Sequence, residues 1–248
     1  MKKITALALL GLALFSGGRV SAAPAASSLA EANTQYQTGD FKQAAELYEG
    51  VIKAGSASGA VYYNLANAYF RLGRKGKALV NYERALGLLP RDRNIRWNLD
   101  ILRSVLQDRV EIENEALIFD FIHRINGYLS VDETAALFSL VLFMFFLAIF
   151  LATYLPKAGL AAQVFLVPCL IAAAVLFGFK YAEVKDPRAV VLDKEVYTYY
   201  GPSERETKAF LLHEGAEARV LDESKDWIYL GLKNKNAGWI RKKSCEII

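Results

Sequence analysis

Two apolar runs of 22 residues each, 134–155 and 158–179, constrain this chain more than any other feature, because neither contains a charged residue. At about 1.5 Å of rise per residue, each run would form a helix roughly 33 Å long, which is enough to cross the hydrocarbon core of a bilayer. Pro156 and Gly159 interrupt the two runs and favour a hairpin over one long helix. The runs are apolar on every side, which favours membrane spans over the alternative of a buried hairpin in a soluble protein.

The spans also lack Asp, Glu, Lys, Arg and His, which argues against a transporter, a pump or a channel and favours an anchor. Residues 24–130 carry 13 basic and 12 acidic side chains, and residues 180–248 carry the same numbers. The net charge of +4 is therefore dispersed, unlike the clustered basic face of a nucleic-acid-binding protein. An apolar content of 54% excludes a disordered chain.

Residues 1–22 have the pattern of a signal peptide. Lys2 and Lys3 precede a 12-residue apolar core, and small residues stand before Ala23. An uncleaved anchor or a buried helix are the alternatives. Export would place both flanking segments on the outer side of a bacterial cytoplasmic membrane, with only the loop around Lys157 in the cytoplasm. Basic residues beside the spans favour the reverse orientation. We expect the signal to prevail, because an exported chain is committed before the spans emerge.

The chain repeats itself with a period of 34 residues across 25–58 and 59–92. The matching pairs are Ala32 with Ala66, Asn33 with Asn67, Gly39 with Gly73, Ala44 with Ala78, and Tyr48 with Tyr82. This pattern resembles the tetratricopeptide repeat, an all-α helix-turn-helix unit whose small residues let paired helices approach. We expect repeats with a capping helix over 25–107, followed by a juxtamembrane helical linker over 108–133.

The resemblance implies a concave face that is lined by the first helix of each unit and binds peptides. It places on this face Asn33, Tyr36, Gln37, Tyr63, Asn67, Phe70, Arg71, Trp97 and Ile101. Asparagine amides can hold an extended peptide backbone, and Arg71 can meet an acidic group. The alternative is that asparagine is simply common at these positions of the family.

The tail, 186–248, reads as a small all-β barrel with five short strands at 189–192, 195–199, 218–222, 226–232 and 237–240. Gly201-Pro202-Ser203, His213-Glu214-Gly215, 226–230 and Gly238-Trp239-Ile240 resemble the bacterial SH3-like domain. His213 is expected in a loop and Cys245 as a buried thiol in the last strand. The resemblance implies a ligand such as a cell-wall or protein peptide, bound by an aromatic groove of Tyr197, Tyr199, Tyr200, Trp227 and Trp239. The alternative is that Trp227 and Trp239 pack the core or rim of the barrel.

The sequence contains no nucleotide-binding or metalloprotease motif. Cys169, Cys245, His123 and His213 do not stand at the spacing of a metal site. We therefore expect no enzyme, no cofactor and no metal.

The complete layout resembles the BatE-type membrane proteins of bacterial aerotolerance operons. That resemblance implies partners with von Willebrand factor type A domains and a MoxR-type ATPase. The expected function is a non-enzymatic, membrane-anchored scaffold on the periplasmic side of the cytoplasmic membrane. The alternative is a peptidoglycan-binding module that acts through the SH3-like domain. A sensor that signals across the membrane is disfavoured, because the loop around Lys157 offers little cytoplasmic surface.

Overall fold

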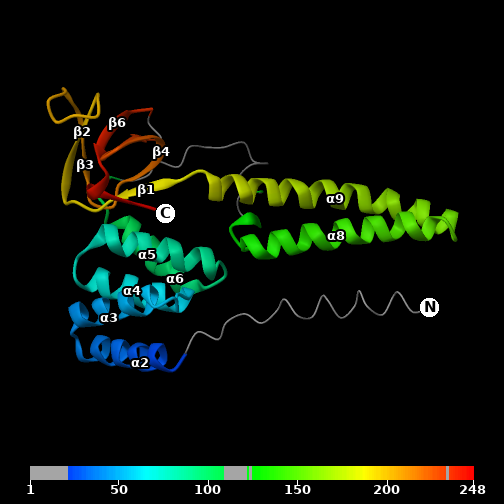
Figure 1. Cartoon of the computed structure of the whole chain (residues 1–248), viewed down its shortest axis with the longest axis horizontal. Helices are drawn as coiled ribbons and strands as arrows, with labels where there is room; N and C mark the ends of the chain where they lie inside the picture. The colour runs from blue at the N-terminus through cyan, green and yellow to red at the C-terminus, as the bar shows by residue number, and fades with distance from the viewer. Residues whose placement is uncertain (1–21, 109–121, 123–124, 233–234) are drawn as a thin grey trace.

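The computed structural model describes residues 22–108, 122, 125–232 and 235–248. Figure 1 shows three parts: helices α2 to α6, a β domain that lies against them, and a long hairpin of α8 and α9 that projects from their junction. The predicted signal peptide lies outside the described residues except for Ala22, and so does most of the predicted linker at 108–133.

Five helices form the repeats: α2 (Ala22–Thr38), α3 (Phe41–Lys53), α4 (Gly59–Arg71), α5 (Lys75–Leu88) and α6 (Arg93–Ser104). Side-chain caps begin three of them, because Asp40, Ser58 and Asp92 accept hydrogen bonds from the first free backbone N–H groups of α3, α4 and α6. Gly39 and Gly73 follow α2 and α4 with φ of +90° and +71°, a backbone conformation that glycine adopts without strain.

The 34-residue period is visible in the packing. Ala32, Ala44, Ala66 and Ala78 are fully buried, and the large rings of the second helices, including Tyr82, fill the space between the paired helices. The small residues let the paired helices approach closely, and the rings beside them fill the remaining space. Each unit buries its apolar face against its neighbour, and repeat proteins build a continuous core in this way.

The hairpin consists of α8 (Val131–Ala152) and α9 (Pro156–Lys185). Both helices are long and apolar enough to cross a membrane, and most of their side chains are exposed. A Cβ added at Gly159 would lie 2.3 Å from the Cβ of Ala152, so glycine is required where the two helices meet. The second helix continues six residues beyond the predicted span, which ended at Phe179.

The β domain is one antiparallel sheet of seven strands in the order β3-β2-β6-β5-β4-β1-β7. The strands are β1 (Arg188–Val191), β2 (Glu195–Tyr199), β3 (Lys208–His213), β4 (Glu217–Ser224), β5 (Trp227–Gly231), β6 (Ala237–Arg241) and β7 (Cys245–Ile247), with a 3-10 turn, η1 (Lys242–Ser244), before the last.

Five strands were predicted, and the sheet has seven. Strand β3 was missed because its run of apolar residues does not alternate, and the three-residue β7 is defined only by its pairing with β1. His213 was predicted in a loop but is the last residue of β3, where it pairs with Glu195. Cys245 begins β7 and is half-buried. Burial, followed by the nearby carboxylates of Asp193 and Glu223, raises the pKa of its thiol to about 11, so the thiol stays protonated at neutral pH.

Strand β1 joins the two soluble parts because both of its faces are buried. Ala189 and Val191 belong to the core of the β domain, whereas Val190 between them is fully buried in the core of the repeats. Leu192 and Ile248 also pack against the repeat core. The β domain therefore covers the last helical pair, as a further repeat would, and supplies the cap that a helical solenoid needs.

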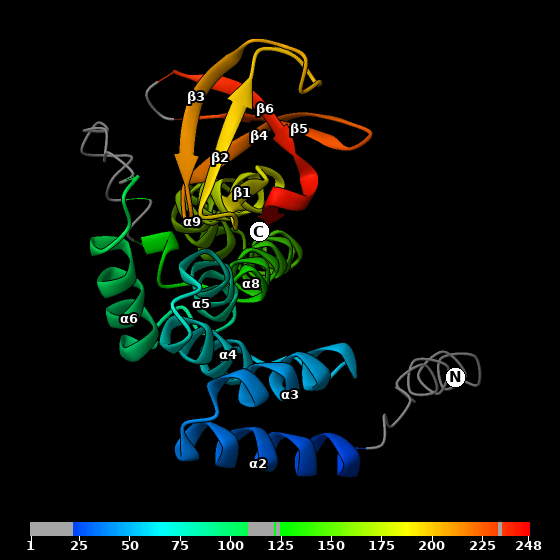
Figure 2. The same ribbon diagram turned by 90° about the vertical axis from the view of Figure 1, so that its left-hand side faces the viewer.

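Close backbone approach reinforces this junction. A Cβ at Gly76, near the start of α5, would lie 2.5 Å from the backbone oxygen of Val191, and the N–H of Gly76 donates to Glu214 at 3.0 Å. The backbone N–H of His213 donates to Asp108 at 2.7 Å, which ties β3 to the segment after α6. Figure 2, which looks along the hairpin, shows the β domain on one side of α5 and helices α4, α3 and α2 on the other.

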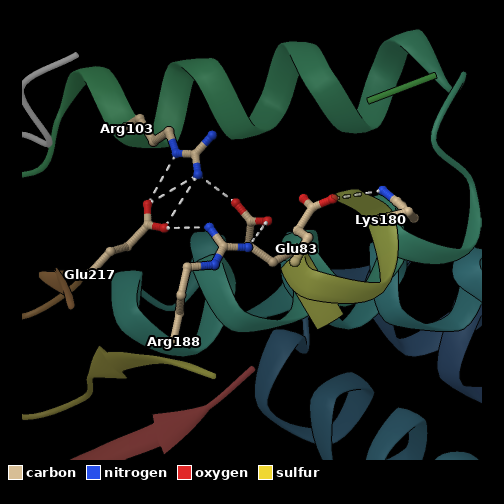
Figure 3. A network of polar contacts seen from close by, with 6 residues as sticks. Glu83, Arg103, Lys180, Arg188 and Glu217 are labelled. Carbon is tan, nitrogen blue, oxygen red and sulfur yellow. Dashed lines mark hydrogen bonds and ion pairs between the residues drawn. The ribbon is translucent and has the colours of Figure 1, made fainter. Parts of the chain in front are cut away.

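A network of charges lies across the same junction (Figure 3). Arg103 of α6 contacts Glu83 of α5 at 2.5 Å and Glu217 of β4 at 3.1 Å, and Arg188 of β1 contacts both acids. The two carboxylates are only 11% and 8% exposed. Burial raises the pKa of Glu83 against the opposing attraction of Arg103 and Arg188. Burial would lower the pKa of Arg103, but Glu83 and Glu217 outweigh it and raise that pKa.

Candidate functional site

The concave face of the repeats contains two neighbouring hollows that share Tyr36. The first, of about 320 Å³, is lined by Asn33, Tyr36, Gln37, Tyr48 and Asn64. The second, of about 170 Å³, is lined by Tyr36, Asn67, Phe70, Arg71, Tyr82, Asn98 and Ile101. Together they form a groove, hereafter the helical groove, that runs over α2, α4 and α6.

A hydrogen-bonded unit of two asparagines and a tyrosine forms the floor of the groove. The Oδ1 atom of Asn33 accepts from the hydroxyl of Tyr48 at 2.7 Å and from Nδ2 of Asn64 at 3.3 Å. Each member has a counterpart 34 residues later, and these make the same contacts: Oδ1 of Asn67 accepts from Tyr82 at 2.5 Å and from Nδ2 of Asn98 at 3.0 Å.

These bonds leave a regular set of polar atoms available in the groove. Among the described residues, Nδ2 of Asn33 and Nδ2 of Asn67 donate to no protein group, and Oδ1 of Asn64 and Oδ1 of Asn98 accept from none. Each unit therefore presents one donor and one acceptor. A peptide unit likewise carries one N–H and one C=O group. The two asparagine units of the groove therefore present two sites, each of which can form hydrogen bonds with one peptide unit of a ligand.

The tyrosines keep this pattern fixed. Burial raises the pKa of Tyr48, and burial likewise raises the pKa of Tyr82. Both hydroxyls therefore stay protonated at neutral pH and donate to the asparagine oxygens, which sets the direction of the amide groups.

Arg71 provides the charge of the second hollow. Its guanidinium lies 4.2 Å from the centre of the Phe41 ring, and the ring of Tyr36 meets Phe41 edge to face at 5.2 Å. Phe41 thus supports both Arg71 and Tyr36 from the second helix of the first repeat. A cation held over a ring remains free to pair with an anion on its other side.

The structure brings most of the predicted groove residues together. Seven of the nine line the hollows: Asn33, Tyr36, Gln37, Asn67, Phe70, Arg71 and Ile101. The other two do not line them. Tyr63 is half-buried and accepts from Nδ2 of Asn98 at 3.0 Å, and Trp97 is 68% exposed on α6.

Sequence reasoning missed Asn64 and Asn98, which complete the two units. Their separation of 34 residues matches that of Asn33 and Asn67, so the period itself could have indicated them. The comparison of 25–58 with 59–92 does not indicate them, because Asn64 stands opposite Ala30 and Asn98 lies beyond the second unit.

The predicted aromatic residues of the β domain lie mostly on the outer face of the sheet. Tyr199 of β2 stands opposite Trp239 of β6, which stands opposite Tyr229 of β5. Trp239 stacks on Tyr229 with 5.0 Å between ring centres, and Trp227 meets Tyr199 edge to face at 5.7 Å. The sheet core lies on the other face, with Ile228, Leu230 and Ile240 fully buried.

Exposure differs among these rings. Trp227 is only 7% exposed beneath Tyr199 and the guanidinium of Arg241, so it packs rather than presents a surface. Tyr197 is 44% exposed, with the ammonium of Lys208 3.8 Å from its ring centre. Tyr200 is 70% exposed beyond the end of β2. Tyr229 was not predicted, although its place two residues after Trp227 in an alternating strand puts both on one face.

Comparison with known proteins identifies the helical part. Residues 29–93 match the model of the tetratricopeptide repeat family. Over this range, the helices are similar to tetratricopeptide repeats. Such repeats are typically non-catalytic modules for protein–protein interaction, and within the described residues no group of three or more His, Cys, Asp or Glu could hold a metal ion.

The other comparisons are less informative. No curated protein matches the chain. Among solved structures, the chain is similar to an NlpC/P60 family protein from Bacillus cereus ATCC 10987, with 19% sequence identity and a TM-score of 0.23. The match covers 27% of this chain and only 22% of that protein. A likeness this slight gives no information about function.

Proposed function

We propose that this protein is a non-enzymatic scaffold, anchored by the α8–α9 hairpin in the bacterial cytoplasmic membrane with both soluble parts on the outer side. Its helical groove binds an extended peptide segment of a partner protein. The observation that carries the proposal is the pair of asparagine units, each with one free donor and one free acceptor in the groove. Main-chain recognition of this kind suits extended peptides, and Arg71 adds a preference for an acidic group.

The wider context of the proposal comes from the layout of the chain. Repeats, an apolar hairpin and a β domain, which we take to be SH3-like, occur in the same order as in BatE-type proteins. We therefore propose membrane proteins with von Willebrand factor type A domains as partners, in a complex that serves aerotolerance or a related stress response.

Reversing the charge of Arg71 tests the groove. We expect Arg71→Glu to weaken binding of acidic peptides about tenfold or more, since a hydrogen bond to a charged group contributes about 1.5–3 kcal/mol. The measurement is retention of the full-length protein, in detergent, on an array of synthetic peptides of varied charge. Arg74→Glu is the matched control, because Arg74 is an exposed arginine in the loop after α4 that does not line either hollow. Equal retention of acidic peptides by wild type and Arg71→Glu would contradict the assignment.

A second candidate function is binding of peptidoglycan by the β domain, which the stacked Trp239 and Tyr229 favour because sugar rings pack on flat aromatic faces. The test is co-sedimentation of the full-length protein with purified cell wall. The intact chain is needed because Val190 of β1 is buried in the repeats. If this candidate holds, Trp239→Ala should lose co-sedimentation while Leu221→Ala, at an exposed leucine of β4 outside the predicted aromatic groove, retains it. Absence of co-sedimentation by wild type would exclude this role.

A further inference from the structure

The loop between α5 and α6 lies at the base of the hairpin. Arg91 in this loop forms an ion pair with Glu133 in the first turn of α8. Arg96 at the start of α6 donates to the backbone oxygen of Gly127, just before α8, and its guanidinium lies 4.7 Å from the ring centre of Tyr128. The repeats are therefore held in a fixed position beside the hairpin, and Figure 1 shows the hairpin leaving the molecule next to this loop.

This position defines a level along the hairpin. Glu133 is the last charged residue before the charge-free run that begins at residue 134, and on α9 the corresponding run ends at Phe179, before Lys180. In a bilayer, the change from charged to apolar side chains marks the boundary between headgroups and acyl chains. Because Arg91 pairs with Glu133, the α5–α6 loop lies at that boundary.

The loop carries the side chains that such a boundary accommodates. Leu88, the last residue of α5, is 53% exposed, and Leu89, which packs on Gly59 of α4, is still 39% exposed. Exposed Arg93 follows them. Tyr128 and Tyr181, on the adjoining parts of the hairpin base, are also exposed, and tyrosine and arginine are residues that settle at a membrane interface.

The acidic side chains of this edge are largely engaged. Glu133 pairs with Arg91, Glu183 pairs with Lys180 at 3.1 Å, and Asp186 pairs with Arg219 at 2.6 Å. Asp92 accepts from the backbone N–H groups that open α6. Asp132 is the exception, since it is exposed and forms no ion pair within the described residues. Among the residues that the structure describes, the exposed leucines are therefore not surrounded by unpaired negative charge that would repel a phospholipid surface.

We propose that the α5–α6 loop, together with Leu88 at the end of α5, inserts into the headgroup region of the bilayer that the hairpin spans, so that the repeats are held against the membrane surface at a second point. This inference rests on the proposed membrane anchor. It fixes the orientation of the helical groove: partner segments are captured close to the membrane and not at the end of a flexible tether.

Fluorescence quenching by spin-labelled lipids tests the proposal in the full-length protein. Cys169 and Cys245 are replaced by serine, and single cysteines are introduced as Leu88→Cys, Leu72→Cys and Phe143→Cys. Each is labelled with nitrobenzoxadiazole and reconstituted into vesicles of phosphatidylcholine and phosphatidylglycerol. Leu72 is the matched control, an exposed leucine that follows α4 and precedes α5, so that it lies at the other end of α5 from Leu88, and α5 is about 20 Å long. Phe143 reports on the hairpin itself.

We expect the label at position 143 to be quenched by nitroxides on the acyl chains. The label at position 88 should be quenched by nitroxides at the headgroup, at a depth within about 10 Å of the headgroup–acyl boundary, and the label at position 72 by neither. Quenching at 143 with none at 88 would overturn the inference and leave the anchor standing. Absence of quenching at 143 would overturn the anchor, and the inference with it.

Discussion

Replacing Val190 with aspartate is expected to destabilise both soluble parts of the protein together, by about 4 kcal/mol or more. Val190 is fully buried in the core of the repeats, although it belongs to a strand of the β domain. A carboxylate there would have to be buried without a partner or would force the junction open, and either outcome exposes the last helical pair. Thermal unfolding of the full-length protein in detergent, followed by circular dichroism and tryptophan fluorescence, measures the loss.

Two companion variants make this result specific. Val190→Ala should cost about 2 kcal/mol, since it removes buried methyl groups without adding charge. Leu221→Asp places the same charge on a half-exposed residue of β4 and should change stability by about 0.5 kcal/mol or less. If Val190→Asp lowers the stability of the β domain alone and the helical signal melts as in wild type, then the β domain does not cap the repeats.

Replacing Arg103 with leucine should have the second largest effect, a loss of about 3 kcal/mol, because it leaves two nearly buried carboxylates with Arg188 as their remaining partner. Arg219→Leu is the control, since Arg219 is an exposed arginine of β4 whose pair with Asp186 lies at the surface. That variant should change stability by less than about 1 kcal/mol. Equal stability of Arg103→Leu and Arg219→Leu would show that the network contributes little to the junction.

The loss in Arg103→Leu should also depend on pH. Burial already raises the pKa of Glu83 in the folded protein above its ordinary value of 4.5, and removal of Arg103 takes away an attraction that opposes this. Above pH 4.5 the unfolded chain then binds fewer protons than the folded protein, so stability falls as pH rises through this region. The difference between wild type and Arg103→Leu should therefore grow between pH 4.5 and neutral pH. A difference that is constant with pH would rule out Glu83 as its source.

Features that repeat or persist along the chain could be predicted from the sequence. The period of 34 indicated the helical pairs and four buried alanines, and two charge-free runs indicated the apolar helices. Strands β2 and β5 were found because apolar and polar side chains alternate or cluster within one short window. In each case the physical signal, burial on one face or on all faces, is local.

The junction between the parts could not be predicted, because its residues are distant in sequence and carry no pattern of their own. Glu83 and Glu217 become neighbours only when β4 packs beside α5 and α6. The apolar run of β1 was recognised as a strand, yet nothing in it indicated that Val190 would enter a different core from Ala189 and Val191. In the groove, the asparagines were predicted as ligand contacts, but their oxygens proved to be engaged with Tyr48 and Tyr82, which leaves the amide nitrogens of Asn33 and Asn67 free.

The hairpin geometry places both soluble parts at the same end of the two apolar helices. The side of the membrane on which the α8–α9 loop lies therefore determines the side on which the repeats and the β domain lie. Single cysteines at Lys157, in the first turn of α9 beside the hairpin loop, and at the exposed Leu72 and Leu221 can be tested with a membrane-impermeant maleimide in intact bacterial cells, after Cys169 and Cys245 are replaced by serine. A scaffold on the outer face predicts labelling at 72 and 221 in intact cells, and labelling at 157 only after lysis. Labelling at 157 alone would place the repeats and the β domain in the cytoplasm and contradict the proposed function.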